Sequence, residues 1–148
     1  MKGLRLAVVA LAALATSASA QSTPTGVWKA VFAGPPAARP KVPAYFEIDI
    51  RQGDRSVTGT VRADRWLQDG VISDATIDGN HVTFTSVMEK GWWSTTSGGV
   101  RVDHCCPKLI FDATIDGDKM SLTLTWSSTE VSGGAGTKYP MEATRLSR

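Results

Sequence analysis

Residues 72–80 read ISDATIDGN and residues 110–118 read IFDATIDGD, so the chain carries nearly the same segment twice. Each copy is followed by a run in which apolar and polar residues alternate, HVTFTSVM after the first and KMSLTLTW after the second. A turn that contains Asp-Gly between two alternating runs is the strongest short-range sign of a β-hairpin. Two such hairpins predict an antiparallel sheet in which consecutive strands lie side by side.

Four other runs also have the composition of strands: 26–33, 44–50, 56–63 and 137–146. In the second of these runs, Phe46, Ile48 and Ile50 alternate with polar or charged residues. Side chains that are two apart in a strand share one face of the sheet, so these three are expected to point inward.

With the two hairpins, at about 71–88 and 108–126, these runs make eight predicted strands and no helix. Residues 91–107 are the longest irregular stretch, with one short strand expected within SGGVRV. Short, evenly spaced strands are typical of a sandwich or a barrel. Sequential hairpins favour an all-β antiparallel up-and-down barrel, which removes exposed sheet edges; a β-sandwich is the alternative. The faces expected to point inward carry Val71, Ser73, Ala75, Ile77, Val82, Phe84, Ser86 and Met88 in the first hairpin, and Leu109, Phe111, Ala113, Ile115, Met120, Leu122, Leu124 and Trp126 in the second.

The N-terminus has the features of an export signal. Lys2 and Arg5 precede a short apolar run, and Ala18-Ser19-Ala20 is a small-residue cleavage site. The apolar run is shorter than the roughly 20 residues that a transmembrane helix needs. We therefore expect residues 1–20 to be a signal peptide, residues 21–148 to be a single barrel domain, and the protein to be secreted or periplasmic.

Charge and cysteine content narrow the range of functions. The chain has 16 Lys and Arg and 14 Asp and Glu, and removal of Lys2 and Arg5 would leave 14 of each. A neutral domain with scattered charges gives no electrostatic reason to bind nucleic acid. The two cysteines, Cys105 and Cys106, are consecutive, so they cannot staple distant segments together as disulfides usually do in exported proteins.

Gly26-Val27-Trp28 on the first predicted strand resembles the G-x-W signature of the calycins, the lipocalin-like barrels. The resemblance implies that Trp28 closes one end of the barrel and that an arginine near the last strand packs across its ring, where Arg145 stands. Stacking of guanidinium on indole contributes about 0.5–2 kcal/mol. The repeated IDG hairpins also look like those of small exported bacterial barrel domains.

Tryptophans are the first candidates for a ligand site. Trp92 and Trp93 are adjacent, so in a strand their rings would face opposite sides, and in a loop one of them could be exposed. An exposed indole favours a partner such as a sugar face or another protein. Trp126, at the end of the second hairpin, is expected on the inward face. The competing interpretation is that one of the adjacent pair is core and the other covers a barrel mouth.

His104-Cys105-Cys106 offers soft metal ligands. Consecutive residues rarely all point at one ion, and no distant cluster completes the set, so we predict no metal and assign the cysteines a structural role. The alternatives left open are two free thiols, a vicinal disulfide and an intermolecular bond.

Acidic residues recur at equivalent positions in the two repeats, Asp74 with Asp112 and Asp78 with Asp116. Paired carboxylates can act as general acid and base. However, the second pair precedes glycine in turns, where Asp is favoured for its backbone bonding, and the first pair falls on the face opposite the apolar set. We therefore predict no catalytic residues and no cofactor.

The sequence thus predicts a secreted, non-catalytic binding protein for a small apolar molecule or a glycan, held in the barrel interior or at a rim formed by Trp92, Trp93 and Trp126. The main alternative is a structural or protein-interaction module without a ligand. An outer-membrane barrel is disfavoured because the strands are short and the chain has no terminal aromatic residue. A hydrolase is the last alternative. The ligand, the presence of a cavity and the oligomeric state stay open.

Overall fold

The computed structural model describes residues 23–39, 43–54, 56–127 and 135–147. The predicted signal peptide at 1–20 lies outside the described residues. A short 3-10 turn, η1 (Pro36–Ala38), lies in the Pro-rich connection between the first two strands.

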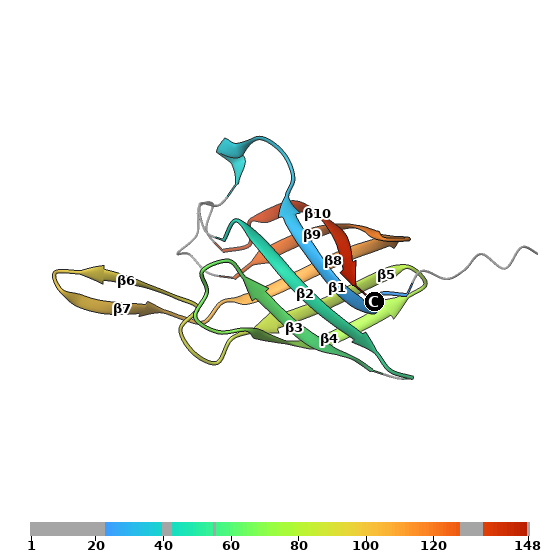
Figure 1. The fold of residues 1–148 in the computed structure, drawn as a ribbon, viewed down its shortest axis with the longest axis horizontal. Helices are drawn as coiled ribbons and strands as arrows, with labels where there is room; N and C mark the ends of the chain where they lie inside the picture. Colours follow the sequence, from blue (N-terminus) through green and yellow to red (C-terminus); the bar gives the residue numbers. More distant parts are fainter. Residues whose placement is uncertain (1–22, 40–42, 55, 128–134, 148) are drawn as a thin grey trace, which may run out of the picture.

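Eight antiparallel strands form a closed barrel in the order β1-β10-β9-β8-β5-β4-β3-β2 (Figure 1), and pairing of β1 with β2 closes the sheet. This confirms the predicted up-and-down barrel. Strands that follow one another in the chain are neighbours in the sheet, except that β5 pairs with β8. The barrel strands are β1 (Gly26–Phe32), β2 (Tyr45–Gln52), β3 (Val57–Ala63), β4 (Gly70–Asp78), β5 (His81–Val87), β8 (Lys108–Asp116), β9 (Lys119–Trp126) and β10 (Lys138–Ser147).

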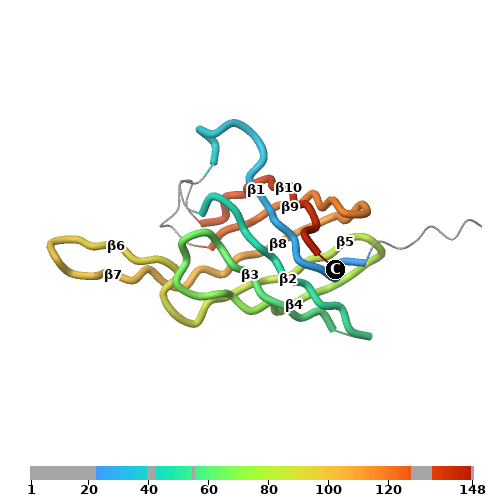
Figure 2. Tube along the Cα trace, in the orientation of Figure 1, coloured from blue at the N-terminus to red at the C-terminus, as the bar shows by residue number. Residues whose placement is uncertain are grey.

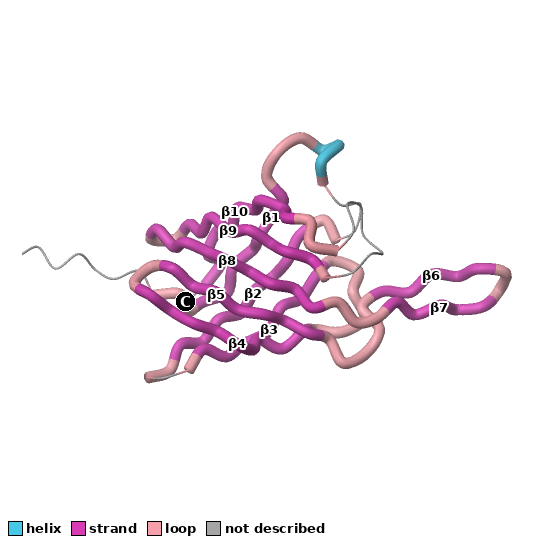
Figure 3. Tube along the Cα trace, turned by 180° about the vertical axis from the view of Figure 1, so that it is seen from behind, coloured by secondary structure: helices cyan, strands magenta, loops and turns pink. Residues whose placement is uncertain are grey.

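The connection between β5 and β8 is a separate hairpin. Its strands, β6 (Trp93–Ser97) and β7 (Val100–His104), form a two-stranded sheet that points away from the barrel (Figure 2, and from behind in Figure 3). We call it the ribbon. The sequence predicted one short strand here, because the Ser, Thr and Gly residues give no apolar alternation. The turn Gly98-Gly99 has φ values of 57° and 78°, the backbone that a two-residue hairpin turn requires.

The barrel interior is apolar. Along β8 and β9 every second residue is buried, as the alternation predicted. Phe84 and Phe111 stack on one another with ring centroids 4.8 Å apart. Burying each such side chain stabilises the fold by about 1.5–3 kcal/mol, so the centre of the barrel is a packed core.

The inward face of β4 differs from the prediction. Val71 and Ser73 were expected to point inward, but Val71 is 63% exposed and Ile72 is 5% exposed, and Ser73 is exposed as well. The pairing of β4 with β5 shifts between Ser73 and Thr76, and Asp74 has a φ of 48°. This β-bulge adds one residue to β4, which moves the preceding side chains to the other face.

Hydrogen bonding ties the bulge to the neighbouring strand. The Thr85 hydroxyl donates to a carboxylate oxygen of Asp74 at 3.1 Å, and the Lys108 ammonium lies 3.7 Å from the same oxygen. Asp is one of the few residues that adopts a left-handed backbone without a large penalty. The bulge therefore has a local cause that an alternating apolar pattern does not reveal.

Position 59 requires glycine because β3 approaches its neighbour β2 closely there. Its φ is 150°, and a Cβ at this position would overlap the backbone oxygen of Asp49 and lie 3.2 Å from a methyl of Ile72. The backbone of β3 can approach β2 this closely only without a side chain.

We predict that Gly59→Ala lowers the free energy of unfolding by about 2–4 kcal/mol, because it adds steric overlap to backbone strain. Gly79→Ala is the matched control: Gly79 has a φ of 61°, and a Cβ added there would meet nothing within 4 Å, so only strain of about 1 kcal/mol is expected. Urea unfolding of both variants measures the difference. Equal losses in the two variants would contradict the close approach.

Candidate functional site

The barrel has two ends that differ in construction. The β2–β3, β4–β5 and β8–β9 turns meet at one end, together with the residues before β1 and after β10; we call it the terminal end. The ribbon and the connections after β1, β3, β5 and β9 lie at the other, which we call the tryptophan end. Both ends are closed, by different contacts.

Arg145 closes the terminal end over Trp28. Its guanidinium carbon lies 4.1 Å from the centre of the Trp28 ring, and its side chain is 4% exposed. The same guanidinium forms an ion pair with Asp118 at 2.9 Å. It also donates to the backbone oxygens of Thr23 and Gly117 at 2.8 and 3.0 Å. The Arg145 guanidinium thus connects the residues before β1, the strand β1 itself and the β8–β9 turn.

The tryptophan end is filled by aromatic rings. Trp66, Trp92 and Trp126 meet edge to face, with centroids 5.3 Å apart for Trp66 and Trp92 and 5.4 Å for Trp92 and Trp126. Phe46 packs against Trp66 at 5.3 Å. We call these four residues the aromatic plug. The β3–β4 loop brings Trp66 to this end of the barrel.

The plug leaves little aromatic surface for a ligand. Trp92 is 1% exposed and Trp126 is 0% exposed. Among the described residues, the indole N–H groups of Trp66, Trp92 and Trp126 have no hydrogen-bond acceptor. Of the two interpretations of the adjacent tryptophans, this geometry favours the one in which Trp92 is core.

Trp93 lies at the root of the ribbon. Its ring is half-buried and stacks on the imidazole of His104, with centroids 4.2 Å apart. The following residues, Cys105 and Cys106, are joined by a vicinal disulfide. Within the described part of the chain, no group of three or more His, Cys, Asp or Glu is arranged to hold a metal ion.

The repeated acidic residues lie on the outside. The side chains of Asp74 and Asp112 are 70% and 64% exposed. His81, on the other hairpin, places its Nε2 atom 2.7 Å from a carboxylate oxygen of Asp112. Asp78 and Asp116, which precede the glycines of the two turns, are exposed too. These carboxylates face solvent rather than a cavity.

One seam of the barrel is only partly bonded. β3 and β4 pair only at Thr60 with Val71 and at Val61 with Gly70, whereas β2 and β3 pair from Phe46 to Gln52. Toward the terminal end the two strands therefore diverge. The bulge at Asp74 and the close approach of Gly59 to β2 both lie in this part of the seam.

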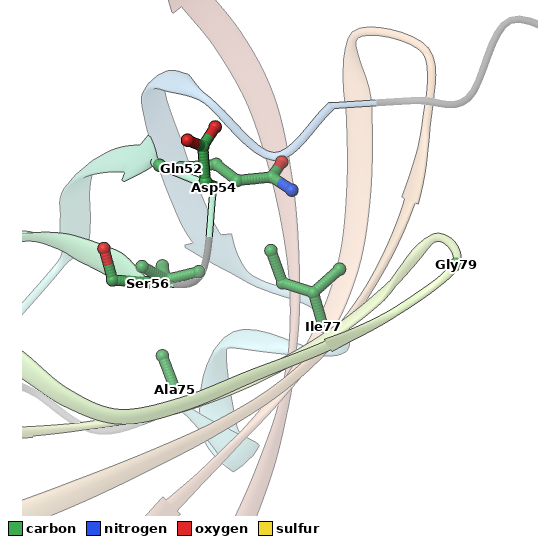
Figure 4. Close-up of a pocket in the computed structure, with 8 residues that line it drawn as sticks. Gln52, Asp54, Ser56, Ala75, Ile77 and Gly79 are labelled. Carbon is green, nitrogen blue, oxygen red and sulfur yellow. The ribbon is translucent and has the colours of Figure 1, made fainter.

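A pocket with a cavity volume of about 330 Å³ occupies the divergent part of the seam; we call it the side pocket. Figure 4 shows Ala75 and Ile77 rising from β4 toward a space bordered by Gln52, Asp54 and Ser56. Three lining side chains, Val57, Ala75 and Ile77, are half-buried and pack against the core from the inner face. The pocket is lined by Gln52, Gly53, Asp54, Ser56, Val57, Ala75, Ile77 and Gly79.

A second hollow, also of about 330 Å³, lies at the β3–β4 loop and is lined by Tyr45, Glu47 and residues 62–69. Arg62 donates through Nε to Asp69 at 3.0 Å and through a terminal nitrogen at 2.9 Å. These bonds raise the pKa of the Arg62 guanidinium, which stays charged. The Arg62–Asp69 ion pair stands beside this hollow, whose lining also includes the buried Ala63 and the half-buried Trp66.

Comparison with models of protein families, with curated proteins and with solved structures found no match for this chain. The closed, eight-stranded antiparallel barrel is compatible with a calycin-like architecture. Among the described residues, no helix has the length and apolar character to cross a membrane.

The buried phenol of Tyr139 makes the stability of the barrel depend on pH. The residue is 6% exposed and packs edge to face on Phe32 at 5.8 Å. Its hydroxyl has no hydrogen-bond partner among the described residues, and burial raises the pKa of the phenol. Ionisation of Tyr139 therefore opposes folding.

We predict that Tyr139→Phe leaves the stability unchanged or raises it at neutral pH, because no hydrogen bond is lost. Since the pKa is raised in the folded state, the wild-type stability from this group is complete below the unfolded pKa of about 10 and is lost as the pH rises through the folded pKa. Urea midpoints should therefore diverge in favour of the variant above about pH 10. A difference that stays constant from neutral to alkaline pH would contradict the assignment.

Proposed function

We propose that the protein is an exported, non-catalytic binding protein that holds a small apolar molecule in the side pocket between β3 and β4. The observation that carries the proposal is the divergent seam: it leaves Val57, Ala75 and Ile77 half-exposed beside a cavity of about 330 Å³. Small-molecule sites are concave, with apolar walls and a few polar groups, and have volumes of about 300–1,000 Å³. The side pocket lies at the lower limit of that range.

The rim of the pocket defines the kind of ligand. Gln52, Asp54 and Ser56 supply an amide, a carboxylate and a hydroxyl above the apolar floor. The carboxylate only accepts hydrogen bonds when ionised, and the other two groups both donate and accept. A molecule with an apolar body and a hydroxyl or amine head group would satisfy both parts of the pocket.

A glycan is less well supported than an apolar molecule. An exposed aromatic ring offers a surface for the face of a sugar, but Trp92 and Trp126 contact other aromatic rings on the inside of the barrel. This argues against the predicted tryptophan rim as the binding site.

Export and the calycin-like relationship form the rest of the proposal. The signal-like segment at 1–20 supports a secreted or periplasmic location. The position of Arg145 over Trp28 supports the relationship inferred from Gly26-Val27-Trp28. In such a barrel, the Arg145 cation and the Trp28 ring close the terminal end. The side pocket then opens near that end, through the wall between β3 and β4.

We predict that the protein enhances the fluorescence of Nile red, a neutral apolar dye, and that Ala75→Leu weakens this binding by about tenfold or more. The added side chain would fill the floor of the pocket and exclude the dye. A tenfold weaker affinity corresponds to a loss of about 1.4 kcal/mol of binding free energy. Thr76→Leu is the matched control, because it adds the same side chain to the next residue, on the exposed outer face. Fluorescence titration of the three proteins is the measurement.

Trp92→Phe distinguishes the side pocket from the tryptophan end. The proposal predicts that this variant binds Nile red as the wild type does. If the wild-type protein does not bind the dye, or if Trp92→Phe abolishes binding while Ala75→Leu leaves it intact, the side pocket is not the site.

A further inference from the structure

The ribbon leaves two strand edges without partners. Among the described residues, β7 pairs with β6 and with no other strand. A two-stranded hairpin on its own is marginally stable in water, and an unpaired edge is a template for pairing with another chain. Natural sheets protect such edges with proline or with charges that repel a second edge. Residues 93–104 contain no proline.

The register of the hairpin shows which residues face the free edge. Ser97 and Val100 flank the two-residue turn, and Val102 lies opposite Thr95. Residues that flank a two-residue turn exchange hydrogen bonds, and bonding then alternates along the strand. The backbone groups of Val100 and Val102 therefore face β6, and those of Arg101 and Asp103 face the open side.

The open edge of β7 carries one positive and one negative side chain, placed symmetrically about Val102. Arg101 and Asp103 lie on either side of it, and within one chain the Arg101 Nε atom is 2.7 Å from a carboxylate oxygen of Asp103. If two β7 strands align antiparallel about Val102, Arg101 of each copy lies opposite Asp103 of the other. Opposite charges at facing positions stabilise a strand pair, and like charges destabilise it.

The opposite face of β7 carries two exposed valines, and the same alignment places this face beside that of the second copy. Val100 is 64% exposed and Val102 is 42% exposed. In the same alignment the two Val102 side chains lie opposite each other, and Val100 lies opposite His104. The register that pairs the charges therefore also brings the two Val102 side chains together.

We propose that the β7 edge pairs antiparallel with the β7 edge of a second copy of the chain, so that two ribbons form one four-stranded sheet between two barrels. A twofold interface requires that residue i meets residue j while j meets i, and Arg101 with Asp103 satisfies this requirement. The β6 edge, from Trp93 to Ser97, carries no charge and has no such means of fixing a register. The interface is separate from the side pocket and independent of the proposed ligand.

The test is the mass of the purified protein, measured by sedimentation equilibrium over a range of concentrations. The wild type is expected to sediment as a dimer. Arg101→Asp places two carboxylates opposite two others, and Asp103→Arg places two guanidinium groups opposite two others, so each variant should raise the dissociation constant by about tenfold or more. An equimolar mixture of the two variants restores opposite charges at both positions and should form heterodimers.

Two further variants complete the experiment. The double variant R101D/D103R exchanges the charges within one chain and should dimerise again. Arg51→Asp is the matched control: Arg51 forms the same kind of ion pair with Asp49, at 3.0 Å, but on a barrel strand that has partners on both sides. This control should remain dimeric.

The proposal is overturned if the wild type is monomeric at every concentration, since no edge pairing then occurs. It is equally overturned if both single variants remain dimers, or if their mixture stays monomeric, because another surface or another register would then be responsible.

Discussion

The structure depends on closure of the sheet by β1. This strand pairs with β10 on one side and with β2 on the other, so the first and last strands of the chain become neighbours. Closure removes the edges that an open sheet would expose and surrounds the apolar side chains of all eight strands. Arg145 strengthens this junction, because it reaches from β10 across the ring of Trp28 on β1.

Two departures from the regular closed barrel carry the functional proposals. At the β3–β4 seam, the bulge at Asp74 and the close contact of Gly59 with β2 accompany two strands that diverge instead of pairing. Between β5 and β8, the chain leaves the barrel and returns as the ribbon. An incompletely paired seam uncovers core side chains, and a projecting ribbon offers unpaired backbone.

Much of the architecture could be predicted from the sequence because it follows from local patterns. The repeated Asp-Gly turns indicated the two hairpins, and the alternation from Met120 to Trp126 predicted a buried face that the structure confirms. The position of Arg145 near Trp28 followed from the calycin resemblance. These features depend on residues that are close in the chain or on a motif at a known place.

The bulge, the plug and the side pocket could not be predicted in the same way. A period of two residues assigns faces only while the ladder is regular, so the bulge at Asp74 reversed the assignment of Val71. Trp66 joins Trp92 and Trp126 because two separate connections and the end of β9 meet at one barrel end. The side pocket exists because two strands diverge, which depends on the geometry of the whole sheet.

Amide hydrogen exchange followed by NMR measures hydrogen bonding along every seam of the barrel in one experiment. If β1 closes the barrel, exchange is slow along β1 on the sides that face β2 and β10. Exchange is expected to be fast for the amides of residues 57–59 and 72–78 that face the divergent part of the β3–β4 seam. Equal protection of that seam and of the β1–β10 seam would show that the β3–β4 seam is not open.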